Sequence, residues 1–235
     1  MKNFFKSIKP VEWIIWSVSA AAIVTVFFVF GNTQYHYLVG SLIGITALVF
    51  VSKGNPLGQV LTVVFSVFYG IISFSCSYYG EMITYLAMTA PMAVAALIVW
   101  LKNPYEGNKS EVKVNSLSTK ERWLFPLLTA AVTVAFYFIL QALNTANLIV
   151  SSLSVATSFV ASYLTARRSR FYAVGYAVND AVLIVMWILQ TLNDITYFPM
   201  IVCFAAFLAL DIYGFVNWTK MLRKQSATNG DVKSY

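Results

Sequence analysis

The chain has 235 residues, of which 59% are hydrophobic and only 11% are charged, and its mean hydropathy is +0.72. Soluble domains carry roughly 25% charged residues, so this composition excludes an ordinary soluble protein and indicates an all-α integral membrane protein. The net charge is +7. The basic residues are confined to short loops without interleaved exposed aromatic residues, which argues against a nucleic-acid partner.

Eight apolar stretches are long enough to cross a bilayer as helices, which takes about 20 residues. The first four cover Trp13–Phe30, Tyr37–Ser52, Leu57–Ser75 and Met82–Leu101. The first stretch runs past the small residues that could imitate a signal-peptide cleavage site, so we expect a retained helix. Pro91 lies near the centre of the fourth stretch and removes one backbone donor, which predicts a kink there.

A long polar segment, 102–122, separates these spans from the rest of the chain. It is too charged for the membrane and too short for a domain, so we interpret it as a cytoplasmic linker. The later spans cover Trp123–Leu143, Asn147–Ala166, Arg167–Gln190 and Thr196–Trp218. The polar tail Thr219–Tyr235 is expected to be disordered at its end.

The loop charges support this count of spans. Eight spans place alternate loops on opposite sides, and all 16 Lys and Arg residues then fall on the side that receives both termini. The loops of the other side contain none and carry Glu81 and Asp194 instead. The positive-inside rule therefore predicts a multi-pass protein of the cell membrane with both termini in the cytoplasm.

Spans two to four resemble spans six to eight in sequence. The clearest matches are Ile83–Tyr85 with Ile195–Tyr197 and Trp100–Lys102 with Trp218–Lys220. Equivalent helices are four spans apart, so the two triples point the same way and form a parallel repeat. Transporters built in this way bind solute near the midplane between the repeats and expose it to alternate sides by rocking.

Two spans in equivalent positions of the triples carry a polar and aromatic helical face, made by residues three and four apart. In span three this face holds Gln59, Thr62, Ser66, Tyr69 and Ser73. In span seven it holds Tyr172, Tyr176, Asn179, Asp180, Leu183, Trp187 and Gln190. A carboxylate at mid-membrane costs about 2.5–3.5 kcal/mol, which favours a substrate site. Packing between helices is the alternative interpretation.

These segments resemble the PnuC family of vitamin-precursor transporters, in the form found in Gram-positive bacteria. The resemblance covers nearly the whole chain and rests on GNPLGQVLTVVFSVFYG (54–70), YYGEMITYLAMTAP (78–91), WLKNPYEGNKSEVKVN (100–115), YAVGYAVNDAVLIVMWI (172–188) and LDIYGFVNW (210–218). It implies facilitated, energy-independent uptake of nicotinamide riboside, an NAD precursor that a cytoplasmic kinase phosphorylates and traps. It also suggests a homotrimer.

The fold implied by the resemblance is all-α integral membrane, with two parallel three-helix bundles joined by a linking helix. This is the 3+1+3 plan of the SWEET sugar transporters, here with an extra N-terminal helix. The expected segments are an N-terminal cytoplasmic segment with the extra helix (1–35), the first bundle (36–102), the linker and linking helix (103–146), the second bundle (147–220) and a cytoplasmic tail (221–235).

One departure from the family concerns the substrate. The nicotinamide riboside branch has a Trp-x-x-Trp pair near the start of the seventh span, and this pair aligns with Tyr172 and Gly175 here. The family's tryptophan contacts therefore do not carry over, whereas Asn179 lies close to the family's asparagine. Relatives that resemble this family take thiamine or riboflavin, so thiamine or another vitamin stays an alternative solute.

Nicotinamide riboside and thiamine both carry a fixed positive charge on an aromatic ring. The candidate substrate-binding residues are Gln59, Tyr69, Tyr176, Asn179, Asp180, Trp187, Gln190 and Asp211. Their carboxylates and aromatic rings would suit a cationic ring, and their amides would suit ribose hydroxyls or a carboxamide. Alternatively, Asp180 or Asp211 only hydrogen-bonds a neighbouring helix, or Asp211 pairs with Arg167 or Arg170.

Other function classes have less support. A proton-coupled carrier would use Asp180 or Asp211, and an uncoupler would then stop uptake. An enzyme would need a catalytic or metal-binding cluster, and the single His36 and the distant Cys76 and Cys203 do not form one. We therefore expect a transporter without cofactor or metal, whose partners are a small molecule and the lipid bilayer.

Overall fold

The structure is a computed structural model that describes residues 9–30 and 34–231, with side chains up to residue 228. In this part it has eight helical segments that are long and apolar enough to cross a membrane, which confirms the predicted count and the all-α membrane class. The elements are α2 (Pro10–Val29), α3 (Tyr35–Ser52), α4 (Leu57–Ser75), α5 (Tyr79–Ile83), the π-helix η1 (Thr84–Thr89), α6 (Ala90–Lys102), β1 (Pro104–Tyr105), β2 (Asn108–Val112), α7 (Thr119–Ala142), α8 (Leu148–Ala166), α9 (Tyr172–Thr191), the 3-10 helix η2 (Ile195–Tyr197) and α10 (Phe198–Asp231).

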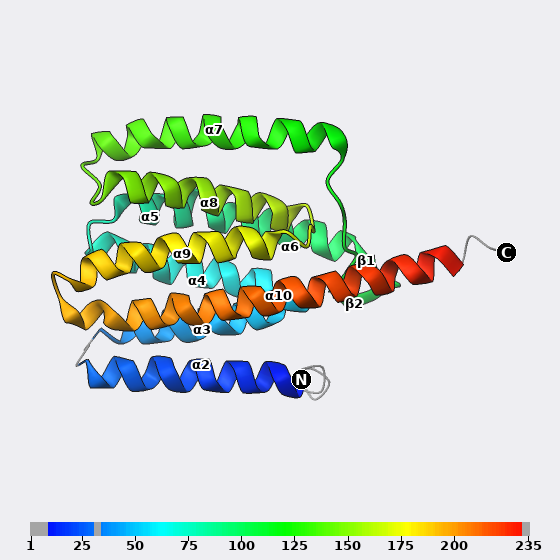
Figure 1. The fold of residues 1–235 in the computed structure, drawn as a ribbon, viewed down its shortest axis with the longest axis horizontal. Helices are drawn as coiled ribbons and strands as arrows, with labels where there is room; N and C mark the ends of the chain where they lie inside the picture. The colour runs from blue at the N-terminus through cyan, green and yellow to red at the C-terminus, as the bar shows by residue number, and fades with distance from the viewer. Residues whose placement is uncertain (1–8, 31–33, 232–235) are drawn as a thin grey trace.

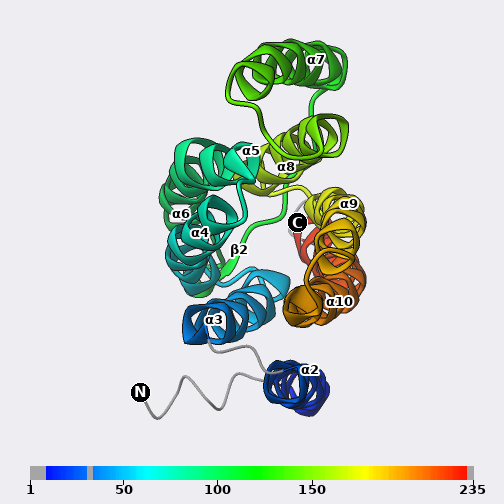
Figure 2. The same cartoon turned by 90° about the vertical axis from the view of Figure 1, so that its left-hand side faces the viewer.

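Six of the spans form a closed ring, seen end-on in Figure 2 and from the side in Figure 1. Consecutive spans pack side by side in each triple: α3 on α4 and α4 on α6, then α8 on α9 and α9 on α10. The ring closes where α3 meets α10 and where α6 meets α8. Each triple thus meets the other through its first and last helix, so the interior of the ring is bounded by both triples.

Helices α2 and α7 lie outside the ring. α2 packs against α3 and α10, whereas α7 packs mainly against α8, and Leu140 is its one fully buried residue. The outer face of α7 is apolar and exposed, as for Trp123 (82%), Leu124 (62%) and Leu127 (68%). Lipid tails are as apolar as such side chains, so this face suits contact with the bilayer.

The segments that carry the described Lys and Arg residues gather at one end of the molecule, the right-hand end in Figure 1. They are the start of α2, the α3–α4 turn, the segment 102–122, the α8–α9 turn and the end of α10. We call this the basic end. This placement of the basic residues at one end agrees with the distribution of loop charges in the sequence.

The fourth span is interrupted just before Pro91. It begins as α5, passes through η1 as a π-helix and continues as α6. Proline lacks an N–H donor, and its ring collides with the carbonyl one turn earlier. A π-helical turn takes up this irregularity, so the disturbance expected at Pro91 takes the form of a π-bulge. Two residues of η1, Tyr85 and Thr89, line the cavity described below.

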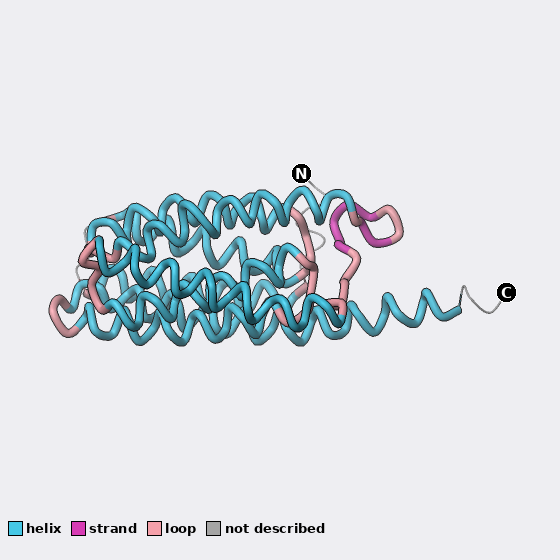
Figure 3. The backbone as a smooth tube through the Cα atoms, turned by 90° about the horizontal axis from the view of Figure 1, so that it is seen from above, coloured by secondary structure: helices cyan, strands magenta, loops and turns pink. Residues whose placement is uncertain are grey.

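The polar segment 102–122 is more ordered than a plain linker, because β1 and β2 form an antiparallel hairpin (Figure 3). The buried Gln225 of α10 binds this segment through its amide, which donates to the Val112 carbonyl (3.1 Å) and accepts from the Val114 N–H (2.8 Å). These bonds attach α10 to the hairpin segment, and α10 continues as one helix to Asp231, through most of the polar tail expected from Thr219. Disorder was expected at the end of that tail, where residues 232–235 lie outside the described part.

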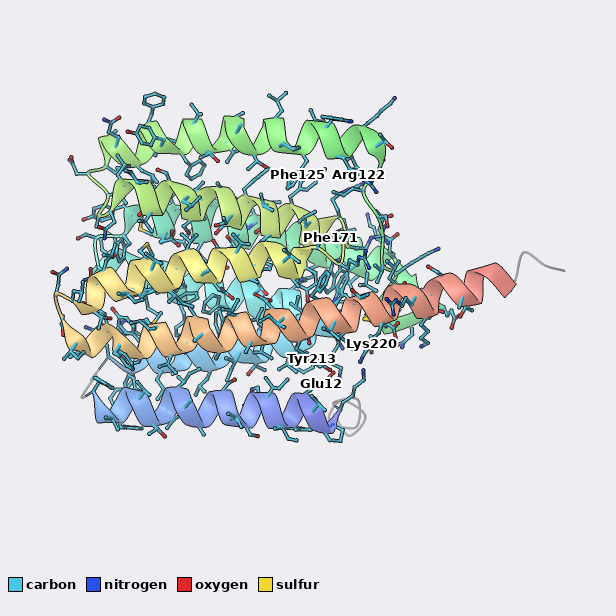
Figure 4. All side chains as sticks on the ribbon, viewed as in Figure 1. Glu12, Arg122, Phe125, Phe171, Tyr213 and Lys220 are labelled. Atoms are coloured by element: carbon cyan, nitrogen blue, oxygen red, sulfur yellow. The ribbon has the colours of Figure 1, made fainter. Side chains whose placement is uncertain are left out.

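Glu12 binds α2 to both triples at the basic end. Its side chain is fully buried and accepts hydrogen bonds from the Tyr213 hydroxyl of α10 (2.9 Å) and the Lys9 N–H (2.7 Å). The Lys53 ammonium of the α3–α4 turn lies 3.2 Å from the same carboxylate. Figure 4 shows Glu12 and Tyr213 facing each other between α2 and α10. The extra N-terminal helix is therefore anchored at a defined place.

Gly58 sets the close packing of α4 on α3. A Cβ at this position would lie 2.6 Å from the Val51 backbone nitrogen and 3.0 Å from the Ala47 carbonyl oxygen. Backbone atoms cannot avoid the clash by changing rotamer as a side chain can. We therefore expect Gly58→Ala to lower the free energy of unfolding by about 1–3 kcal/mol. The measurement is thermal unfolding in detergent. Gly40→Ala is the control, since a Cβ there meets side-chain atoms at 3.2 Å or more; equal losses in both variants would contradict this reason.

Candidate functional site

A small cavity lies inside the ring and takes lining residues from both triples. The first triple, with η1, contributes Gly44, Ala47, Leu48, Val51, Gln59, Thr62, Phe65, Tyr85 and Thr89. The second triple contributes Thr165, Tyr176, Asp180, Phe207 and Asp211. Its volume of about 40 Å³ has room for only a few water molecules. The cavity lies between the two repeats, where the sequence predicted a solute site.

Asp180 of α9 and Asp211 of α10 form the polar end of the cavity. Both side chains are buried, with 3% and 2% exposure, and their carboxyl groups interact with each other. In each group Oδ2 has no hydrogen-bond partner among the described residues. A buried polar atom without a partner is costly, so these oxygens favour a ligand that supplies one.

Basic side chains do not reach these carboxyl groups. Among the described residues, no Lys or Arg lines the cavity. The ion pair considered for Asp211 is not formed, because Arg167 pairs with Glu121 instead and Arg170 lies over the Phe171 ring, 4.9 Å from its centroid. The cavity therefore holds two buried carboxyl groups without a fixed counter-charge among the described residues.

Neutral hydrogen-bonding groups line the cavity together with the carboxyl pair. Gln59 of α4 is buried, and its Nε2 has no hydrogen-bond partner among the described residues. The Tyr176 hydroxyl lies 3.5 Å from the Ser162 hydroxyl and also reaches the cavity. An amide and a phenol in these positions can form hydrogen bonds with hydroxyl or carboxamide groups of a solute.

An aromatic wall completes the cavity. Phe65 packs edge-on against Tyr85 (centroids 5.9 Å apart) and Phe207 (5.4 Å), and all three line the cavity. Tyr69 packs behind them, 4.3 Å from the Tyr85 ring, and its hydroxyl accepts a hydrogen bond from the Trp187 indole (3.0 Å). Tyr69 and Trp187 thus support the aromatic wall and are not among the lining residues.

Asn179 and Gln190 lie outside the cavity lining as well. The Asn179 side-chain oxygen accepts hydrogen bonds from the hydroxyls of Thr157 (2.7 Å) and Ser158 (2.9 Å) on α8. This amide joins two helices within the second triple. Gln190 is half-buried near the end of α9, almost three helical turns beyond Asp180. Of the eight predicted residues, the cavity brings together Gln59, Tyr176, Asp180 and Asp211.

The structure also identifies residues that sequence reasoning placed elsewhere or missed. Glu81, predicted in a loop, is fully buried at the start of the fourth span, and neither of its carboxyl oxygens makes a hydrogen bond among the described residues. The Ser154 hydroxyl lies nearby without hydrogen-bond geometry. Phe65 and Phe207 were missed because phenylalanine carries no signal against an apolar span, and Tyr85 was missed because it lies outside the two polar faces. The signal that could have identified Glu81 is its position directly before Met82, where the fourth span was predicted to begin.

At Gly175 the structure leaves no room for the second tryptophan of a Trp-x-x-Trp pair. A Cβ at Gly175 would lie 2.9 Å from the Ala161 Cα on α8, so the two helices touch at this point. A tryptophan would force α8 and α9 apart. Tyr172, the other aligned position, is buried against Trp218, with ring centroids 4.8 Å apart. The aromatic surface of this cavity comes from α4, η1 and α10 instead.

Comparisons with known proteins agree on one family. The model of the nicotinamide mononucleotide transporter family matches residues 34–220. Two similar proteins are each named nicotinamide riboside transporter PnuC. One, from Neisseria mucosa, is 26% identical over 217 residues, which cover 90% of this chain and 82% of that protein. The other, from Haemophilus influenzae, is 23% identical over 226 residues, which cover 95% and 96%. A crystal structure of the vitamin B3 transporter PnuC has the same fold, with a TM-score of 0.81, 24% identity and coverage of 92% of this chain and 94% of that chain.

Proposed function

The chain belongs to the nicotinamide mononucleotide transporter family, and we propose that the solute it carries across the cell membrane is nicotinamide riboside. Membership makes it a transporter and not an enzyme. Two relatives are named for the riboside, whereas the family is named for the mononucleotide. The two solutes differ by one phosphate, so the charges that line the cavity distinguish between them.

The carboxyl pair is the observation that favours the riboside over the mononucleotide as the solute. The nicotinamide ring of the riboside has a fixed positive charge, and Asp180 and Asp211 offer it negative charge that no basic residue of the described cavity neutralises. The mononucleotide adds a phosphate, which carries about −1.5 to −2 charges near neutral pH. In a site of low dielectric constant ionised carboxyl groups would repel the phosphate, and among the described residues no Arg or Lys lines the cavity to bind it.

We further propose which groups meet which part of the solute. The cationic ring lies against the carboxyl pair and the faces of Phe65, Tyr85 and Phe207, an arrangement that suits a cation next to aromatic rings. Gln59 and Tyr176 hydrogen-bond the ribose hydroxyls or the carboxamide. Tyr69 and Trp187 hold the aromatic wall, and Asn179 fixes α9 on α8. For Gln190 we retain only the sequence-based prediction that it binds the ribose hydroxyls or the carboxamide of the solute.

Transport requires the cavity to open, because a volume of about 40 Å³ is far below the roughly 300–1,000 Å³ of typical ligand sites. We propose that the two triples separate alternately at the two ends and that movement is facilitated and independent of an energy source. Net uptake then depends on a cytoplasmic kinase that phosphorylates the solute. The basic end faces the cytoplasm with both termini, and the chains assemble as a homotrimer.

Proton-coupled transport is the second candidate, because two carboxyl groups in one cavity are also a proton-binding arrangement. Uptake of labelled riboside into proteoliposomes distinguishes the two. Facilitated transport predicts equilibration of the riboside across the membrane with or without a pH gradient and with or without an uncoupler. Accumulation above equilibrium that an uncoupler abolishes would favour the proton-coupled carrier, and failure to transport the riboside at all would overturn the proposed solute.

A further inference from the structure

A second, larger cavity lies at the basic end, outside the ring and beneath the start of α7. Its volume is about 530 Å³, and its walls come from the segment 115–117, the start of α7, the end of α8, the α8–α9 turn and α10. Its lining includes Arg122, Phe125, Leu164, Arg170, Phe171 and Leu222. Figure 4 shows Arg122 and Phe125 beneath the start of α7 and Phe171 at the start of α9.

The charge of this cavity is purely positive. Arg122 and Arg170 line it, and no Asp or Glu does so in the described part of the chain. Neither guanidinium lies within 4 Å of a described carboxylate, and Glu121, the neighbour of Arg122 in sequence, pairs with Arg167. Arg170 lies over the Phe171 ring, which holds its guanidinium at the cavity wall. Two guanidinium groups without acidic partners suit a phosphate group, which they bind with fork-like hydrogen bonds.

Asn115, Ser116 and Ser169 also line the cavity, and the remaining walls are apolar and continue into the lipid-facing surface. Phe125, Leu164 and Leu222 line the cavity, and Phe171 lines it while remaining 48% exposed. Next to Arg122, Trp123 is 82% exposed, as is common for tryptophans at the level of lipid headgroups. A soluble anion would gain little from these apolar walls. A molecule with a phosphate and hydrocarbon chains would use both features.

We propose that this cavity binds an anionic phospholipid, with its phosphate between Arg122 and Arg170 and the start of its acyl chains along Phe125, Leu164 and Phe171. Basic pockets between membrane helices bind anionic headgroups on the same physical grounds. The bound lipid fills the space between α7 and the ring at this end, where α7 otherwise contacts mainly α8. It thereby stabilises the position of the helix that joins the two triples.

The test measures lipid retention by the purified full-length protein after exchange into a lipid-free detergent, by native mass spectrometry. We expect phosphatidylglycerol to be retained in preference to phosphatidylcholine. Arg122→Gln combined with Arg170→Gln should weaken phosphatidylglycerol retention by roughly 30-fold, since each cationic residue contributes about 1 kcal/mol near an anionic lipid. Lys102→Gln combined with Arg223→Gln is the matched control, because both residues belong to the basic end but do not line the cavity.

Several results would overturn the proposal. Equal retention of phosphatidylcholine, or an equal loss in the control, would show that the cavity has no headgroup preference. Glycerol phosphate that displaces phosphatidylglycerol at similar concentration would indicate a site for a soluble phosphate. If the double variant does not fold, Arg122→Gln alone serves, since Arg122 is exposed, and unchanged retention in that variant contradicts the proposal. Riboside transport is not the readout, so this result is independent of the proposed function.

Discussion

Asp180→Asn is expected to weaken the binding of nicotinamide riboside by about 2 kcal/mol or more, which is roughly 30-fold in the dissociation constant. The side chain is buried, lines the cavity and has a carboxyl oxygen without a hydrogen-bond partner among the described residues. Asparagine keeps the shape and removes the negative charge that would face the cationic ring. Isothermal titration of the purified variant measures the change directly.

A neutral ligand is the matched control for this variant. The reduced, dihydro form of the riboside has nearly the same shape but no charge on its ring. If charge attraction is the reason, Asp180→Asn should change the affinity for the reduced form by less than about threefold. An equal loss for both ligands would show that the substitution disturbs the packing of the cavity.

Asp211→Asn extends the comparison to the other carboxyl group. Because the two groups interact and line the same cavity, removal of either one leaves the other to face the cation. We expect each single variant to keep measurable binding and the double variant to lose it. Additive losses from the two substitutions would argue against a shared site, since residues in contact deviate from additivity.

Trp187→Ala is expected to lower the free energy of unfolding by about 3–5 kcal/mol, the range for a large buried aromatic residue. The indole is fully buried, donates to the Tyr69 hydroxyl and packs on Tyr78, with ring centroids 5.8 Å apart. Alanine leaves a cavity and an unpaired hydroxyl behind the aromatic wall. Thermal unfolding in detergent measures the effect.

Trp123→Ala is the matched control, because Trp123 is 82% exposed on the outer face of α7 and should cost little stability. The folded fraction of Trp187→Ala should bind the riboside more tightly than Asp180→Asn does, since the indole supports the wall from behind. Full stability combined with lost binding would contradict this role and would place the indole in direct contact with the solute.

The spans, the charge partition and the polar faces were predictable because each has a strong signal in an apolar sequence. A carboxylate or a glutamine within a span stands out, and Gln59, Asp180 and Asp211 do line the cavity. Helical periodicity also placed Asn179 and Trp187 on that face. It could not show that Asn179 is occupied by Thr157 and Ser158, because that depends on how closely α8 approaches α9.

The remaining features depend on contacts between distant segments. Phe65 and Phe207 look like any other apolar residue of a span, and only the meeting of α4 with α10 makes them one wall. Gln225 lies in a polar tail, and its role is visible only beside Val112 of the hairpin. Glu81 was placed in a loop because a charged residue usually ends a span, yet α5 begins before it. Single-sequence patterns carry no information on these pairings.

The choice between riboside and mononucleotide is tested most directly by titration of the purified protein with both solutes, and with thiamine and riboflavin in parallel. We predict binding of nicotinamide riboside and no measurable binding of the mononucleotide, because carboxyl groups line the cavity and, among the described residues, no Arg or Lys does so to bind a phosphate. Thiamine binding without riboside binding would keep the site for an aromatic cation and change the solute. Mononucleotide binding as tight as that of the riboside would contradict the site proposed around Asp180 and Asp211.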